Sequence, residues 1–225
     1  MSTVHVLLLA LCLAAMSPAA LARPAGTAIE QAVGAYERGE VETAQRMFEA
    51  LSRSGLPAAD YNLAVMALDA GQPAQAEGHM RRAAAAGFVT AMLGLGRLHE
   101  TGWLGRVDLP AAMHWYRLAA EGGSVQGMVE TGTAHYLGRG AALDRAQAAH
   151  WYREAAKGGD IGAQYLIASM YEAGDGVQQD LRLARYWYTI AAQNGDEAAP
   201  GKLKEVDARL RSPAAAASPP ATAPP

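Results

Sequence analysis

Three blocks of 36 residues follow one another in this chain without insertion or deletion. Their clearest marker is a Trp-Tyr pair, whose tryptophans are Trp115, Trp151 and Trp187. Glycine, aspartate and alanine positions repeat with the same step: Gly102, Gly138 and Gly174; Asp108, Asp144 and Asp180; Ala112, Ala148 and Ala184. A fixed period of this length is the sequence signature of a solenoid, in which stacked helix pairs bury a shared core.

Each clean block is predicted to fold as helix, loop, helix. In the first block, Ala91, Leu95 and Leu98 share one face of a helix that begins near residue 90. Gly102 ends that helix, because glycine tolerates the left-handed conformation just past a helix end. Asp108 starts the second helix, since its carboxylate can accept hydrogen bonds from the free amides of the first turn.

Two looser blocks precede the clean ones, and an amphipathic segment follows them. We predict an all-α fold, an α-solenoid of about five antiparallel helix pairs with a C-terminal capping helix. The predicted units are two looser repeats at 27–57 and 58–89, three clean repeats at 90–125, 126–161 and 162–197, a capping helix at 198–211, and a disordered Ala/Pro-rich tail at 212–225.

Residues 1–22 have the pattern of a secretory signal peptide. An apolar stretch at 4–15 is followed by Ala20-Leu21-Ala22, a small-x-small cleavage pattern. The stretch is shorter than the roughly 20 apolar residues needed to span a bilayer. We therefore expect an exported protein, periplasmic or secreted, with no transmembrane segment in the mature chain.

Charge and cysteine content exclude several functions. The formal net charge is −3, so no basic field attracts nucleic acid. The only cysteine, Cys12, lies inside the predicted signal peptide. The mature chain would then lack both disulfides and a thiolate nucleophile.

The last clean block resembles the Sel-one-like repeat (SLR), a relative of the tetratricopeptide repeat (TPR). The family pattern runs Gly-x-Gly-Val, Asp, Ala, Trp-Tyr, Ala-Ala and Gly. The matching residues are Gly174, Gly176, Val177, Asp180, Ala184, Trp187, Tyr188, Ala191, Ala192 and Gly195. The earlier blocks depart from it: Ala141 replaces the valine, Leu104 replaces the second glycine, and His99 and His135 occupy the tyrosine position that Tyr171 keeps. Residues 27–57 look like a degenerate TPR unit.

This resemblance implies a right-handed superhelix that acts as an adaptor or scaffold for protein or peptide partners in the bacterial envelope. A cysteine-rich branch of the family has weak β-lactamase activity and carries a disulfide in each repeat. Because the mature chain would have no cysteine, that activity is not carried over to it.

The motifs of common active sites are incomplete in this sequence. Histidines recur in pairs, His99 with His135 and His114 with His150, but one side chain per helix pair does not supply three or four metal ligands. The segment 99–102 (HETG) lacks the second histidine of a zinc protease, and 138–143 (GRGAAL) lacks a third glycine and a preceding strand. We therefore predict no catalytic residue, metal site or cofactor. The repeated tryptophans are predicted to be core residues, although a sugar-stacking ladder is the alternative.

A partner-binding surface is predicted on the concave face, lined by the first helix of each pair. The candidate positions are Tyr61, Val65, Leu68, Leu93, Arg97, Val129, Tyr136 and Tyr165. Trp103 lies in a loop outside the repeat pattern and is a further candidate contact. Burial of these side chains within the superhelix is the competing interpretation. An envelope hydrolase, a glycan-binding protein and a purely structural subunit remain the alternatives to a monomeric adaptor.

Overall fold

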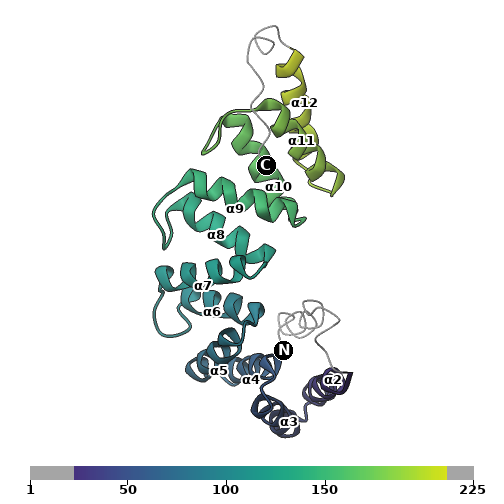
Figure 1. Ribbon diagram of the computed structural model, residues 1–225, viewed down its shortest axis with the longest axis vertical. Coiled ribbons are helices and arrows are strands. Elements are labelled where there is room, and N and C mark those ends of the chain that lie inside the picture. The colour runs from purple at the N-terminus through teal and green to yellow at the C-terminus, as the bar shows by residue number, and fades with distance from the viewer. Residues whose placement is uncertain (1–22, 212–225) are drawn as a thin grey trace. The chain divides into compact units, whose positions relative to one another are not determined.

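The computed structural model describes residues 23–211 (Figure 1), so the predicted signal peptide and tail lie outside it. The described residues form eleven helices and no strand. They divide into two compact units, the first ending at Asp108 and the second beginning at Leu109. No helix of residues 23–211 combines the length and apolar character that a bilayer crossing requires.

The first unit holds five helices in sequence order. Their bounds are α2 Arg23–Glu37, α3 Val41–Arg53, α4 Pro57–Asp69, α5 Pro73–Ala85 and α6 Val89–Thr101. Each helix packs on the next along the chain. Phe48, Leu63 and Met66 lie in the core at the start of this unit, together with small alanines such as Ala44.

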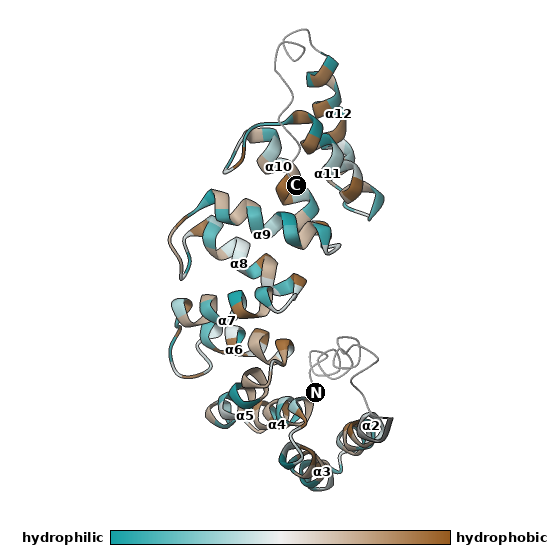
Figure 2. Ribbon diagram, viewed as in Figure 1, coloured by the Kyte–Doolittle hydropathy of each residue, from teal (hydrophilic) through white to brown (hydrophobic). Residues whose placement is uncertain are grey.

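The second unit holds six helices that also pack consecutively. Their bounds are α7 Leu109–Glu121, α8 Val125–Leu137, α9 Arg145–Lys157, α10 Ile161–Ala173, α11 Leu181–Gln193 and α12 Ala199–Arg211. In Figure 2 most of these helices alternate between hydrophilic and hydrophobic residues along their length, as amphipathic helices do. The absence of strands and the consecutive packing confirm the predicted all-α solenoid.

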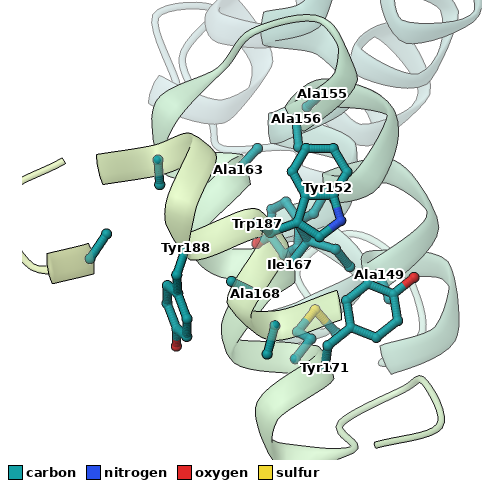
Figure 3. Close-up of a cluster of buried hydrophobic side chains, with 14 of the residues drawn as sticks. Ala149, Tyr152, Ala155, Ala156, Ala163, Ile167, Ala168, Tyr171, Trp187 and Tyr188 are labelled. Carbon is teal, nitrogen blue, oxygen red and sulfur yellow. The ribbon is translucent and has the colours of Figure 1, made fainter. Parts of the chain in front are cut away.

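Alanines and large rings alternate in the core of the second unit. Tyr152, Ile167, Tyr171 and Trp187 are buried there among Ala155, Ala163 and Ala168 (Figure 3). Trp187 and Tyr188 are neighbours in sequence but point in different directions from α11, with Trp187 beside Ile167 and Tyr188 directed away from it (Figure 3). The predicted core role of the Trp-Tyr pair holds for Tyr116, Tyr152, Tyr188 and Trp187, whereas Trp115 and Trp151 are half-buried.

A backbone hydrogen bond closes each long loop between paired helices. The amide of Asp144 donates to the His135 carbonyl at 2.9 Å, and the amide of Asp180 donates to the Tyr171 carbonyl at 2.9 Å. In the first unit the amide of Asp108 does the same to the His99 carbonyl at 2.8 Å. The histidine and tyrosine positions of the pattern therefore share one backbone role, which does not depend on the side chain.

Asp144 and Asp180, at the ends of the two long loops of the second unit, also cap helices, as the repeat pattern predicts. The Asp144 carboxylate accepts from the Gln147 amide at 2.9 Å, and that of Asp180 accepts from the Leu183 amide at 3.0 Å. Because these bonds satisfy amides that have no partner inside the helix, they stabilise the start of α9 and α11.

The second glycine of the Gly-x-Gly pattern has a steric reason. Gly176 has a φ of +72°, and a Cβ built there would overlap the carbonyl oxygen of Arg145 at the start of α9. Gly140 has the same arrangement against Leu109. In the first long loop, where Leu104 replaces this glycine, the positive φ of 93° moves to Gly105.

The helix α12 occupies the position of the first helix in a further repeat. Asp160 caps α10 through the amide of Ala163 at 2.7 Å, and Asp196, one repeat later, accepts from the amide of Ala199 at 2.8 Å. Ala163 and Ala199 are both fully buried. The position of buried Ala168 in α10 is taken by the exposed Lys204 in α12. This polar substitution suits the predicted role of α12 as a terminal cap, because a solenoid needs a polar outer face at its end.

Candidate partner-binding surface

In the second unit, six side chains of α8 and α10 occupy the face that we predicted to be concave. We call this set the first-helix face of unit 2, and its members are Val129, Thr133, Tyr136, Tyr165, Ser169 and Glu172. All six are half-buried, so part of each side chain reaches solvent. Val129, Tyr136 and Tyr165 are therefore partly accessible, and their binding of a partner stays a prediction.

Tyr136 is held by a cation from the second helix of its own repeat. The guanidinium carbon of Arg145 lies 3.6 Å from the centre of the Tyr136 ring, within the range of a cation–π interaction. Arg145 also lies 3.7 Å from the carboxylate of Asp175. A chain of contacts therefore runs from α8 through α9 to the loop after α10, and it fixes where the Tyr136 ring lies.

Glu172 is the most heavily bonded residue of this face. Its carboxylate accepts from the hydroxyl of Tyr188 at 2.9 Å and from the guanidinium of Arg209 at 2.9 Å. The ammonium group of Lys202 lies 3.8 Å away. The side chain of Glu172 is 14% exposed, so its charge is largely balanced by the two cations of α12.

Two tyrosines of the Trp-Tyr pairs, Tyr152 and Tyr188, reach from the second helices to this face. Tyr188 contacts the Tyr165 ring edge-on, with 5.2 Å between the centroids, and the hydroxyl of Tyr152 lies 3.1 Å from that of Thr133. Burial, followed by the bond to Glu172, raises the pKa of Tyr188, and burial raises that of Tyr152. This role was not predicted from the sequence, although Tyr152 stands 19 residues after Thr133 and Tyr188 stands 16 residues after Glu172.

Two candidate residues of the first unit are buried, so the prediction that they line an open surface is wrong. Tyr61 is 2% exposed and Val65 is 7% exposed. The Tyr61 ring lies 5.5 Å from that of Phe88, which precedes α6. The reason is that α4 is apolar all the way round: every residue from 58 to 67 is buried, so this helix has no free stripe.

The other candidates of the first unit reach solvent. Leu68 and Leu93 are half-buried and Arg97 is exposed. Trp103 is 57% exposed in the loop after α6, close in sequence to Val107 at 58%. Trp103 and Val107 are therefore two exposed apolar side chains of one loop, and the role of Trp103 as a contact stays a prediction.

A polar cluster in the first unit joins three helices. The carboxylate of Asp60 on α4 accepts from the hydroxyl of Ser52 at 3.0 Å and from Arg82 at 3.0 Å. The Nδ1 atom of His79 lies 3.2 Å from the same carboxylate. The hydroxyl of Ser52 is bonded to the aspartate and not to the histidine, so the cluster lacks the nucleophile–base contact of a hydrolase triad.

The paired histidines do not gather into a metal site. His114 and His150 are exposed on α7 and α9, where each ring packs edge-on against the tryptophan that follows it, at 5.4 and 5.1 Å. His135 approaches only a backbone carbonyl, that of Ala142 at 3.4 Å. Among residues 23–211, no three His, Cys, Asp or Glu side chains are arranged to hold a metal ion.

Comparison with known proteins agrees with this architecture. The family model of the Sel1 repeat matches residues 89–124, 125–160 and 161–196. No curated protein matches the chain.

Two of the solved structures that are similar to the chain have Sel1-type repeats. One is a protective antigen of uropathogenic Escherichia coli strains that displays an SLR fold, with 28% identity and a TM-score of 0.71 over 80% of this chain. This chain spans only 40% of that protein. The other is a Sel1 repeat protein from Oxalobacter formigenes, with 29% identity and a TM-score of 0.66, and the match covers 87% of this chain and 83% of that one. The resemblance found in the sequence is confirmed, and residues 89–196 are three consecutive Sel1 repeats.

Proposed function

We propose that this protein is a non-catalytic interaction scaffold of the bacterial cell envelope, which binds a protein or peptide partner on the first-helix face of unit 2. Sel1 repeat proteins are typically scaffolds for protein interactions, and this general role agrees with the repeats found at 89–196. The partner, the envelope location and this particular face are our own inference.

The observation that carries the proposal is the fixed placement of Tyr136 and Tyr165. Tyr136 lies under Arg145 at 3.6 Å, and Tyr165 lies edge-on to Tyr188 at 5.2 Å. Tyrosine and arginine most often dominate interface energetics, because they offer a large contact area with polar ends. Rings that are already held in place lose little conformational freedom when a partner binds, which favours affinity.

The charges of this face are largely matched within the protein. Glu172 is balanced by Arg209 and Lys202, and Asp175 lies near Arg145. A partner therefore meets rings, hydroxyl groups and paired charges instead of a field of one sign. Such a surface selects by shape and apolar contact more than by charge.

Binding can be tested by affinity capture from envelope extract with the full chain, followed by direct titration of the purified partner. The test variant is Tyr136→Ala with Tyr165→Ala. The matched control is His150→Ala with Tyr186→Ala, which removes two exposed rings from α9 and α11 of the same unit. All proteins are first compared by circular dichroism.

We expect the partner to be lost with the test variant and kept with the control. If the purified partner binds the test variant as tightly as the native chain, the proposed face is wrong. The exposed side chains of Trp103 and Val107, in the loop after α6, would then be the next surface to test. If neither protein captures a partner, small-molecule and glycan ligands take precedence.

Export has its own test. Residues 1–22 support it by their apolar stretch and cleavage pattern alone. Mass spectrometry of the protein recovered from the periplasm or medium should give an N-terminus at Arg23. Recovery of the chain from the cytoplasm with Met1 in place would overturn this part of the proposal.

A further inference from the structure

We propose that residues 212–225 of this chain bind to the first-helix face of unit 2, as an internal ligand that competes with the partner. This inference rests on the proposed function, since it concerns the same face. The proposed ligand is the segment with the sequence SPAAAASPPATAPP.

The chain leaves α12 next to this face. Arg209, in the last turn of α12, donates to Glu172 at 2.9 Å, and Arg211 is the final residue of the helix. Leu210 packs against the core of the second unit, so the end of α12 is fixed there. Residue 212 follows directly on this helix, three positions after the arginine that bonds to Glu172 at one end of the face.

Side-chain contacts link the loop that follows Glu172 to Tyr136. Glu172 and Tyr136 occupy the same position in successive repeats, 36 residues apart. Asp175, three residues after Glu172, lies 3.7 Å from Arg145, which in turn lies 3.6 Å from the Tyr136 ring. Tyr165 is two helical turns from Glu172 on α10, or about 10 Å along the helix axis.

The segment is long enough to cover this path. Fourteen residues span about 43 Å in an extended polyproline conformation, at ~3.1 Å per residue. The helices from α12 back to α8 pack consecutively, so four steps of at most about 10 Å separate the two by no more than roughly 40 Å.

The chemistry of the segment matches that of the face. Five of its residues are proline, namely Pro213, Pro219, Pro220, Pro224 and Pro225, and none of its side chains is charged. Proline-rich segments bind surfaces lined with aromatic side chains, since their preferred conformation already resembles the bound one. Tyr136 and Tyr165 supply the rings, and their hydroxyl groups have no hydrogen-bond partner within the described residues, so they can donate to backbone carbonyls of the segment.

Covalent linkage strengthens such an interaction. A linked segment competes at an effective concentration in the millimolar range when the linker is short, so even weak contacts keep it bound. A partner of higher affinity then has to displace it.

Paramagnetic relaxation measured by NMR on the full chain tests this directly. The nitroxide label is attached at Ala223→Cys in a Cys12→Ser background. The same label is placed on a chain carrying Tyr136→Ala and Tyr165→Ala, on one carrying Tyr186→Ala, and on one in which the five prolines are replaced by serine. Circular dichroism verifies that all of them are folded.

We expect broadened amide resonances around residues 136 and 165 in the native chain and in the Tyr186→Ala control. The broadening should disappear in the double tyrosine variant and in the proline variant. Equal broadening in all four chains, or none near α8 and α10, overturns the proposal. Broadening that also appears when a labelled chain is mixed with an unlabelled, isotope-enriched one assigns the contact to a second copy, and likewise overturns binding within one chain. No partner is needed, so this experiment can fail while the capture experiment succeeds.

Discussion

The hydroxyl of Tyr188 donates to the carboxylate of Glu172 at 2.9 Å, which joins the buried ring of α11 to the last turn of α10. Burial and this bond raise the pKa of Tyr188 above its ordinary value of about 10. Above that pH the unfolded chain loses the phenol proton while the folded chain keeps it. The free energy of unfolding therefore decreases as the pH rises beyond about 10, because the folded state binds more protons.

Tyr188→Phe should reduce this alkaline loss of stability. At neutral pH the variant loses the hydrogen bond to a charged group, at a cost of about 1.5–3 kcal/mol. Tyr186→Phe is the control, since Tyr186 is 54% exposed. Urea unfolding at pH 7 and pH 10.5 measures both effects. An identical pH dependence for the native chain and Tyr188→Phe would show that another group controls it.

Gly176→Ala should destabilise the chain more than Gly159→Ala does. Both residues have positive φ, 72° and 92°, so both alanines suffer the left-handed strain of roughly 1–2 kcal/mol. Only at Gly176 does the added Cβ also meet the backbone of Arg145, whereas nothing lies within 4 Å at Gly159. Overpacking adds about 1–3 kcal/mol, so the midpoint of urea unfolding should fall further for Gly176→Ala. Equal midpoints would mean that the loop moves away from α9 without cost.

Asp180→Ala should cost about 1 kcal/mol in the free energy of unfolding, because the amides of Arg182 and Leu183 lose their acceptor. Asp180→Asn should restore most of it, since asparagine caps helices as well as aspartate does. Asp175→Ala removes a carboxylate from the same loop without touching a cap, and should change stability by less than about 0.5 kcal/mol. Thermal unfolding of the three variants distinguishes the cap from the charge.

Trp187→Ala and Trp103→Ala should distinguish a tryptophan that stabilises the core from one that is available to bind a partner. Trp187 is 9% exposed, and its removal from the core should cost about 3–5 kcal/mol. Trp103 is 57% exposed, so Trp103→Ala should leave the free energy of unfolding within about 0.5 kcal/mol. If Trp103→Ala nevertheless weakens partner capture, the loop after α6 contributes to binding; unchanged capture confines binding to other surfaces.

The fold could be predicted because its determinants are local and repeated. The glycines that end the first helices and the Asp144 and Asp180 caps act within a few residues, so a single repeat contains the whole pattern. The role of Gly176 follows only from the structure, because it depends on a carbonyl 31 residues earlier in the chain.

The candidate site was less predictable. Helical spacing predicts which residues share one face of a helix, but it does not predict which neighbouring elements bury that face. Val129, Tyr136 and Tyr165 are accessible, whereas Tyr61 and Val65 are buried because α4 is apolar around its circumference. The contacts of Glu172 were missed because its partners come from two other helices, α11 and α12. The spacing of side chains within one helix does not predict contacts with other helices.

The shared register of Asp160 and Asp196 has a consequence for modular growth of the protein. Because each 36-residue block carries its own cap, loop closure and small core residues, a duplicated copy of 125–160 placed after residue 160 would meet the same neighbours that its original meets. The array would lengthen by one block, while α12 would still present Lys204 to water at the end. Tandem duplication or deletion within a gene thus offers this protein a route to a longer or shorter binding surface without a new fold.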